Sequence, residues 1–345
     1  METLIRLYPR SEPIVNFYKN WMNGSSSFEM TTSGSTGDPK VIKIDRSQIE
    51  ASVFMTKNAL ELKPNMNALI CLDPKYIASI IMAARCIILD MNMIIVEPSS
   101  NPLKSIDPSL HIDFASFVPI QIDRMVEDGA TSRMESIDKI LIGGAPLNDR
   151  LKKSLKHLNT DIFLTYGMTE TVSHVALMKM GHQHMDAHYT LLEGIKMKKQ
   201  DNGCLAIAGA VTNQKLINTN DLVEIINDSQ FSWLGRLDNI INTGGIKIIP
   251  ETIEFRLKDW INNPMTNSEF IISSIPDSRL GQKIVLITEG EPIGDDEFSV
   301  IQAYIKNEFS PFHIPRNAYA VQHFIRTDSG KIVRNATQKL LAKVL

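Results

Sequence analysis

The chain has 345 residues, 43% of them hydrophobic, so it can bury a sizeable core and we expect two domains. Its formal net charge of -3 argues against nucleic acid as the main partner, because nucleic-acid-binding proteins usually carry a basic excess. The three cysteines (Cys71, Cys86 and Cys204) are far apart and lack metal-ligand spacing. This usage predicts a reducing, cytoplasmic setting without a disulfide framework.

The first two-thirds of the chain alternate short apolar runs with helical patterns. Buried strands are expected at 68–73, 93–98, 114–120 and 139–146, and helices at 47–62 and 147–158. The most apolar stretch, 76–97, is interrupted by Arg85 and Asp90. It therefore predicts a buried helix over Ile77–Leu89 leading into a strand rather than a membrane span. The N-terminal segment has no uninterrupted apolar core, so we expect no secretion signal.

The pattern changes near residue 200, where short strands separated by Asn, Asp and Gly predict a β-rich subdomain. Further on, a helix is expected over 250–263, with strands at 269–276, 283–290 and 319–325 and a helix at 298–309. The predicted fold class is α/β. A large N-terminal layered domain (1–237) with the β-rich subdomain precedes a small α+β C-terminal domain (238–345).

A loop rich in glycine and hydroxyls, "TTSGSTGDPK", spans Thr31 to Lys40. Its glycines let the backbone turn N–H groups toward one point, and its hydroxyls and lysine add donors, as a polyphosphate cradle requires. It is not a Walker A loop, because the lysine stands three residues after Gly37 and follows Pro39. Taken alone, a solvated polar turn fits as well. The candidate phosphate-binding residues are Thr32, Ser33, Gly34, Ser35, Thr36, Gly37 and Lys40.

A second motif, "TYGMTET", follows an apolar run and places Tyr166, Thr169 and Glu170 where a strand should end. Open α/β sheets bind ligands at that edge. An aromatic ring there can stack on a base, a hydroxyl can reach a phosphate, and a carboxylate can hold Mg2+. Three more charged candidates follow in separate segments: Asp221, Arg236 and Lys331.

Together, "TSGSTGDPK", "YGMTE", "GRLDNIINTGGIKIIPETIE" and "SGKIVR" resemble, in order and spacing, the motifs of the adenylate-forming superfamily of acyl-CoA synthetases, luciferases and peptide-synthetase adenylation domains. Within it, "GRLDN", "FASFVPIQIDRM" and "LIGGAPL" most resemble o-succinylbenzoate–CoA ligases of menaquinone biosynthesis. The resemblance implies a carboxylic acid (o-succinylbenzoate), ATP, Mg2+ and coenzyme A as substrates and cofactors. Another aryl- or acyl-CoA synthetase, a carrier-protein-loading enzyme and an inactive adenylate-binding homologue are the alternatives.

The resemblance also assigns roles to particular residues. Tyr166 and Gly167 are expected against the adenine, with Gly144, Ala145 and Pro146 on its other side. Thr169 should contact the α-phosphate and Glu170 should bind Mg2+. Asp221 should accept hydrogen bonds from both ribose hydroxyls, and Arg236 should reach the same ribose or the phosphate. Lys331 is expected to catalyse adenylation, since a flexible point charge can reach the oxygens that change there.

Domain alternation is a further implication of the resemblance. The C-terminal domain should swing about Asp238 between two half-reactions, after which Gly244 and Gly245 admit the pantetheine arm of coenzyme A. The expected walls of the acid pocket are Val118, Pro119, Gly143 and Ser173. The group that would bind a second substrate carboxylate, and whether the chain forms homo-oligomers, stay open.

The chain departs from the family pattern at three places. The segment before Thr31 is much shorter than in typical members, so either the lineage dispenses with an additional sheet subdomain or a partner subunit shields the remaining sheet. Asn220 stands where relatives usually have Gly, and Thr252 where an acidic residue is common. The histidines His174, His182, His184 and His188 fit no common zinc spacing, and packing is the favoured role for Met178, Met180, Met185 and Met197.

Overall fold

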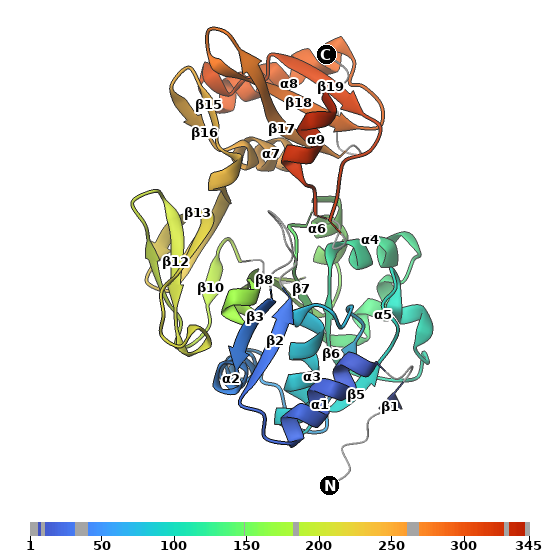
Figure 1. The fold of residues 1–345 in the computed structure, drawn as a ribbon. Helices are drawn as coiled ribbons and strands as arrows, with labels where there is room; N and C mark the ends of the chain where they lie inside the picture. Colours follow the sequence, from blue (N-terminus) through green and yellow to red (C-terminus); the bar gives the residue numbers. More distant parts are fainter. Residues whose placement is uncertain are drawn as a thin grey trace.

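The computed structural model describes residues 6–7, 11–31, 41–147, 149–181, 186–260, 269–327 and 331–341. In this part of the chain, a large body built on one sheet is joined to a small body built on another, as Figure 1 shows. The polypeptide leaves the large sheet and enters the small body through the 3-10 turn η4 (Leu237–Asn239).

The large sheet has 12 strands, and its first half is parallel. In spatial order, the parallel strands are β1 (Arg6–Leu7), β5 (Asn92–Ile95), β4 (Asn67–Ile70), β6 (Ile112–Phe117), β7 (Ile137–Ile142) and β8 (Asp161–Gly167). The antiparallel strands that continue it are β9 (His174–Met180), β10 (Tyr189–Leu191), β14 (Gln230–Arg236), β13 (Ile217–Asn227), β12 (Cys204–Ala208) and β11 (Lys196–Lys199).

Helices cover both faces of the parallel half. On one face lie α1 (Glu12–Met22), α2 (Arg46–Leu60) and α3 (Ile77–Leu89), and on the other α4 (Pro119–Glu127), α5 (Thr131–Glu135) and α6 (Asp149–Lys156). Neighbouring residues of one strand point to opposite faces, so Leu141 joins the first core and Ile140 and Ile142 the second. Burial on both faces explains why these strands are continuous apolar runs in the sequence.

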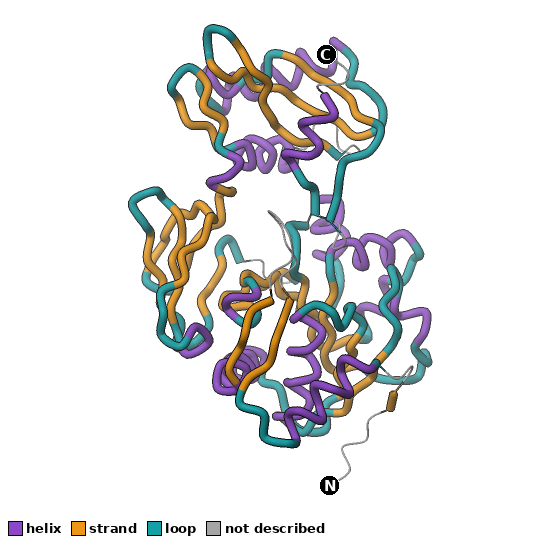
Figure 2. The backbone as a smooth tube through the Cα atoms, in the orientation of Figure 1, coloured by secondary structure: helices purple, strands orange, loops and turns teal. Residues whose placement is uncertain are grey.

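The small body is also layered (Figure 2). Its five strands are β15 (Ile241–Thr243), β16 (Ile246–Ile248), β17 (Phe270–Asp277), β18 (Gly281–Glu289) and β19 (Asn317–Val321). Helices α7 (Pro250–Asp259) and α8 (Asp295–Glu308) pack on one face, and α9 (Arg334–Leu341) packs on the other. Adjacent residues of β17 divide between these faces, with Ile272 in the first core and Ile271 in the second.

Most of the expected elements are confirmed. The helix over Ile77–Leu89 has the predicted bounds, and the predicted strands around it appear as β4, β5, β6 and β7. The β-rich region is present, but it continues the large sheet through the pairing of Tyr189 with Phe231 rather than forming a sheet of its own. The helix expected over 250–263 ends at Asp259, and the last residues of that expectation lie outside the described part. No described helix is both long and apolar enough to cross a membrane.

Candidate functional site

The predicted glycine and hydroxyl loop hangs on a two-stranded ribbon. Strands β2 (Ser27–Thr31) and β3 (Val41–Asp45) are antiparallel, and Thr31 pairs with Val41 at the open end. Thr31 also bridges to Tyr76, next to the start of α3. The ribbon therefore fixes where the loop begins and ends. The loop's predicted phosphate-binding residues, Thr32, Ser33, Gly34, Ser35, Thr36, Gly37 and Lys40, lie outside the described residues.

Asp221 accepts hydrogen bonds from three side chains on two strands of the large sheet, β8 and β14. The Tyr166 hydroxyl donates to Oδ2 over 2.7 Å, Trp233 Nε1 donates to Oδ1 over 3.1 Å, and Arg236 Nη1 donates to Oδ1 over 3.4 Å. Asp221 is 8% exposed, so this carboxylate lies at the floor of the site with its charge matched by the guanidinium. Burial, with Asp221 beside it, raises the pKa of the Tyr166 hydroxyl far above its ordinary value, which keeps this donor protonated.

Of these donors, Tyr166 was a predicted site residue and Trp233 was not. Tyr166 was predicted to lie against adenine, and its ring is 9% exposed with Phe231 edge-on at 5.1 Å. Trp233 was not predicted at all, since an indole in a strand carries no motif. Its pairing opposite Val223 on β13 brings the indole to Asp221, two residues earlier on that strand.

A short connection after β7 brings predicted adenine and acid residues into contact. An added Cβ at Gly143 would lie 2.2 Å from Thr165 Oγ1, and one at Gly144 (φ +91°) 3.5 Å from Val118 Cγ1. Ala145 and Pro146 follow in the same connection, and Val118 and Pro119 begin α4. Glycine at 143 therefore lets the connection lie directly against Thr165 of β8, and glycine at 144 adopts its positive φ without strain.

The turn after β8 is held in a strained form. Ser173 N donates to the Thr171 carbonyl over 2.8 Å, and Val172 between them has φ +67° and ψ -44°. This is the uncommon γ-turn with positive φ, which is unfavourable for a β-branched residue. The turn places Thr169 buried and Glu170 exposed, so the Glu170 carboxylate is accessible from solvent. Strained backbone of this kind clusters at functional sites.

Behind Ser173 lies a buried arginine that the sequence analysis did not select. Arg85, on α3, is 2% exposed, and its Nη2 donates to Thr56 Oγ1 over 3.2 Å and to Ser173 Oγ over 3.3 Å. Its Nη1 donates to Met82 Sδ, and no described residue accepts from its Nε. Burial lowers the pKa of Arg85 to about 10, so it remains charged at neutral pH. No carboxylate is recorded beside this guanidinium within the described ranges, which is unusual because buried charges are normally paired.

The neighbours of Arg85 leave its charge uncompensated. Thr56 Oγ1 donates to the Ser52 carbonyl and lies 3.1 Å from His174 Nε2. Burial and the charge of Arg85 hold the pKa of His174 well below its ordinary range, so the imidazole is neutral. A single arginine in an apolar helix was the only signal of this group in the sequence.

Lys331 approaches the same region from the small body. Its backbone N–H bonds the Thr327 hydroxyl over 3.1 Å, and its carbonyl accepts from Thr327 N–H over 2.8 Å. Burial, and next Arg236, lower the pKa of Lys331, while Asp221 and Glu251 oppose that shift. The charges of Arg236 and Asp221 thus both act on Lys331.

The remaining predicted residues divide between the two bodies. Asp238 lies in η4, where its carboxylate accepts from Arg236 Nη2 over 2.9 Å. Gly244 (φ +58°) and Gly245 (φ +82°) form the exposed tip of the β15–β16 hairpin, a conformation that glycine adopts without strain. His182 and His184 lie outside the described residues, whereas His174 bonds Thr56 and His188 bonds Ser232. Among described residues, one potential metal-ligand group occurs: His111, Asp113 and Asp138.

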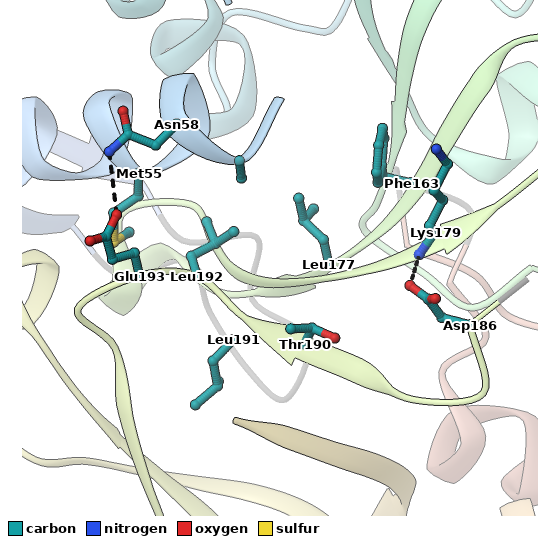
Figure 3. A pocket seen from close by; sticks show the side chains of 11 residues that line it. Met55, Asn58, Phe163, Leu177, Lys179, Asp186, Thr190, Leu191, Leu192 and Glu193 are labelled. Atoms are coloured by element: carbon teal, nitrogen blue, oxygen red, sulfur yellow. Dashed lines mark hydrogen bonds between the residues drawn. The ribbon is translucent and has the colours of Figure 1, made fainter. Parts of the chain in front are cut away.

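A cavity of about 420 Å3 lies elsewhere on the sheet, between α2 and strands β8 to β10 (Figure 3). Leu177 and Leu192 line it, and polar pairs stand at its two sides: Asn58 with Glu193, and Lys179 with Asp186. None of the predicted site residues borders it. The cavity and the predicted site residues are therefore separate features of the structure.

Comparison with known proteins gives a consistent set of relatives. The sequence profile of AMP-binding enzymes matches residues 23–202. The crystal structure of an acyl-CoA synthetase (AMP-forming)/AMP-acid ligase II-like protein from Dyadobacter fermentans is 38% identical and has a TM-score of 0.65. That alignment covers 96% of this chain and 95% of the other, so the two chains are of similar length.

Two further relatives are more distant. The 2-succinylbenzoate–CoA ligase of Staphylococcus aureus is 26% identical over 330 residues, or 89% of this chain, and the chain spans 65% of that enzyme's length. The O-succinylbenzoate coenzyme A synthetase of Bacillus subtilis, solved with ATP and magnesium ion, is 20% identical with a TM-score of 0.74. That match covers 90% of this chain and 69% of the other, and it shows a shared fold.

Proposed function

The chain belongs to the family of AMP-binding enzymes, and from this premise we propose that it joins a carboxylic acid to coenzyme A through an acyl-adenylate. In the first half-reaction, a carboxylate oxygen attacks the α-phosphorus of magnesium–ATP, and pyrophosphate leaves. In the second, the thiol sulfur attacks the acyl carbon, and AMP leaves. The site's position at the carboxyl end of β8 supports this proposal, because open sheets bind nucleotides at that edge.

The proposed roles of the site residues follow from their charges and positions. Asp221 would accept hydrogen bonds from the ribose, and because it already accepts three, the longest contact, from Arg236, is the one a ribose hydroxyl most readily replaces. Lys331 would neutralise charge on the oxygens around the α-phosphorus, where two anions must meet. Glu170 would hold the magnesium that accompanies the phosphates. The loop 32–40 would bind the β- and γ-phosphates.

Domain alternation belongs to the same proposal. Residues 1–237 would bind the nucleotide and acid, and residues 238–345 would turn about Asp238 after adenylation. The Gly244–Gly245 hairpin tip would then replace Lys331 at the site and admit the pantetheine arm, since glycine allows close approach of backbone to a ligand. The three cysteines are buried and free, as expected for the cytoplasmic location that we also propose.

The proposed identity of the acid rests on one structural observation, the buried guanidinium of Arg85, beside which no carboxylate occurs among the described residues. Ser173, a predicted wall of the acid pocket, accepts a hydrogen bond from Arg85. A substrate with a second carboxylate placed there would supply a counter-charge and could accept charge-assisted hydrogen bonds from the donors of Arg85 that its described contacts leave unused. Such an acid is dicarboxylic, and o-succinylbenzoate has this chemistry. We therefore propose o-succinylbenzoyl-CoA as the product.

A panel of acids tests both the proposed ligase activity and the proposed identity of the acid. Pyrophosphate release and CoA thioester formation are measured with o-succinylbenzoate, with benzoate-type monoacids and with aliphatic acids. Preference for o-succinylbenzoate is the expected result. Thioester formation from aliphatic monoacids alone would refute the named substrate but not the ligase, and transfer only to a carrier-protein thiol would favour that alternative acceptor. A chain that binds AMP yet releases no pyrophosphate with any acid would be the inactive homologue.

A further inference from the structure

Asn220 makes a contact across the point where the two bodies join. Its Nδ2 lies 3.2 Å from Oδ1 and 3.2 Å from Oδ2 of Asp238, so one amide faces both carboxylate oxygens. Asn220 belongs to β13, which is held on its two sides by β12 and β14. Asp238 belongs to the η4 turn. The amide is therefore carried by a rigid strand, and its acceptor by the connection between bodies.

Arg236 lies between the carboxylates of Asp238 and Asp221 and contacts both. Its Nη2 donates to Asp238 over 2.9 Å, and its Nη1 reaches Asp221 over 3.4 Å. Asp238 thus has one charged and one neutral donor, both from strands of the large sheet. In this arrangement Lys331 is close enough to Arg236 and Asp221 for their charges to act on it.

We propose that Asn220 is a positioning residue that clasps Asp238 and so favours the orientation in which Lys331 faces the nucleotide side. A rotation about the N–Cα bond of residue 238 (its φ angle) moves the Asp238 side chain together with the small body, relative to the large sheet. Such a rotation carries the Asp238 carboxylate away from Asn220 on β13. The amide contacts are then made in one orientation and lost in the other. A contact that differs between two states shifts their populations by its own free energy. In its kinetic consequence, this inference rests on the proposed two-step function.

The expected size is modest because Asp238 is exposed. Hydrogen bonds from an amide to an exposed carboxylate shift an equilibrium about fivefold. Asn220→Ala should therefore reduce the clasped population about fivefold relative to the other orientation. Asn220→Asp should reduce it further, because it replaces the donor by a like charge beside Asp238, which is partly offset by Arg236.

The direct test measures orientation without catalysis. Spin labels at Lys198→Cys on β11 and Lys306→Cys on α8 report the distance between the bodies by pulsed electron paramagnetic resonance. Both lysines are exposed, while Cys71, Cys86 and Cys204 are buried and should escape labelling. The labelled protein with Asn220 should give one dominant distance. The share of other distances should be larger in Asn220→Ala and largest in Asn220→Asp. Identical distributions in all three would overturn the clasp.

A matched control comes from the same strand. Asn227 Nδ2 donates to Gln230 Oε1 over 2.9 Å at the far hairpin of β13 and β14, away from η4. Asn227→Ala removes the same chemical group and should leave the distance distribution unchanged. If it broadens the distribution as much as Asn220→Ala does, the effect comes from a loosened ribbon, and the proposal is wrong.

Kinetic measurements distinguish a failure of this proposal from a failure of the proposed two-step ligase function. Asn220→Ala should slow adenylate formation by up to about fivefold, the full factor applying only where the clasped orientation becomes the minor one. Thiolysis of preformed adenylate should stay equal or become faster, a split that general loss of stability does not produce. Equal slowing of both halves would contradict the clasp while the ligase function stands. If the protein releases no pyrophosphate with any acid, the proposed function is wrong. The distance measurement would still test the contact between Asn220 and Asp238.

Discussion

Replacing Arg85 by methionine separates a structural role of this arginine from a role in substrate binding. Guanidinium has five N–H donors, and the described contacts use three of them: one to Met82, one to Thr56 and one to Ser173. Two donors, including Nε–H, are then left for a second substrate carboxylate. A hydrogen bond to a charged group contributes about 1.5–3 kcal/mol. Each 1.4 kcal/mol is tenfold, so Arg85→Met should lower kcat/KM for a dicarboxylic acid about 10- to 100-fold.

The assay compares two acids and the stability of the two proteins. For a monocarboxylic analogue of the same ring, kcat/KM should change little, because that acid never meets the guanidinium. The melting temperature should stay constant or rise, since an apolar side chain of similar length replaces a buried charge that lacks a carboxylate partner. Arg85→Lys is the matched variant, which keeps the charge but loses the fork and should recover part of the loss. Equal losses for both acids, or unfolding of Arg85→Met, would show that Arg85 serves the fold.

Three further perturbations test other parts of the site. Lys331→Ala should abolish acyl-adenylate formation while sparing thiolysis of preformed adenylate, and normal pyrophosphate release by this variant would remove the assignment. Asp238→Pro should damage thiolysis more than adenylation, because it restricts φ at the hinge; single-turnover rates that fall equally would speak against a hinge there. Burial raises the pKa of the Glu251 carboxyl above its unfolded value, so its stabilising contribution is complete below the unfolded pKa and is lost as pH rises through the folded one. Glu251→Gln should therefore gain melting temperature relative to wild type between pH 4.5 and 8, and a constant difference across that range would disprove the shift.

Local pattern was sufficient to predict most of the elements and to propose candidate site residues. The apolar run over Ile77–Leu89 was predicted as a buried helix because it is short for a membrane span and contains Arg85, and the structure has this helix. The strands flanking it were predicted from apolar runs between turn residues. Tyr166, Asp221 and Arg236 were selected from separate motifs, and they share one hydrogen-bonded group. The element predictions succeed because helix and strand periodicity and turn chemistry are properties of neighbouring residues.

Contacts between distant segments were decided only by tertiary packing. Arg85 meets Thr56 from 29 positions away and Ser173 from 88, and each of these residues is unremarkable within its own segment. Trp233 reaches Asp221 through strand pairing, and Asn220 reaches Asp238 through the path of η4. Burial of apolar surface sets how α2, α3 and the turn after β8 come together, and polar side chains carried on those elements meet as a consequence. The sequence by itself thus determined which elements form and which motifs they carry, whereas the packed core determined which charges face one another.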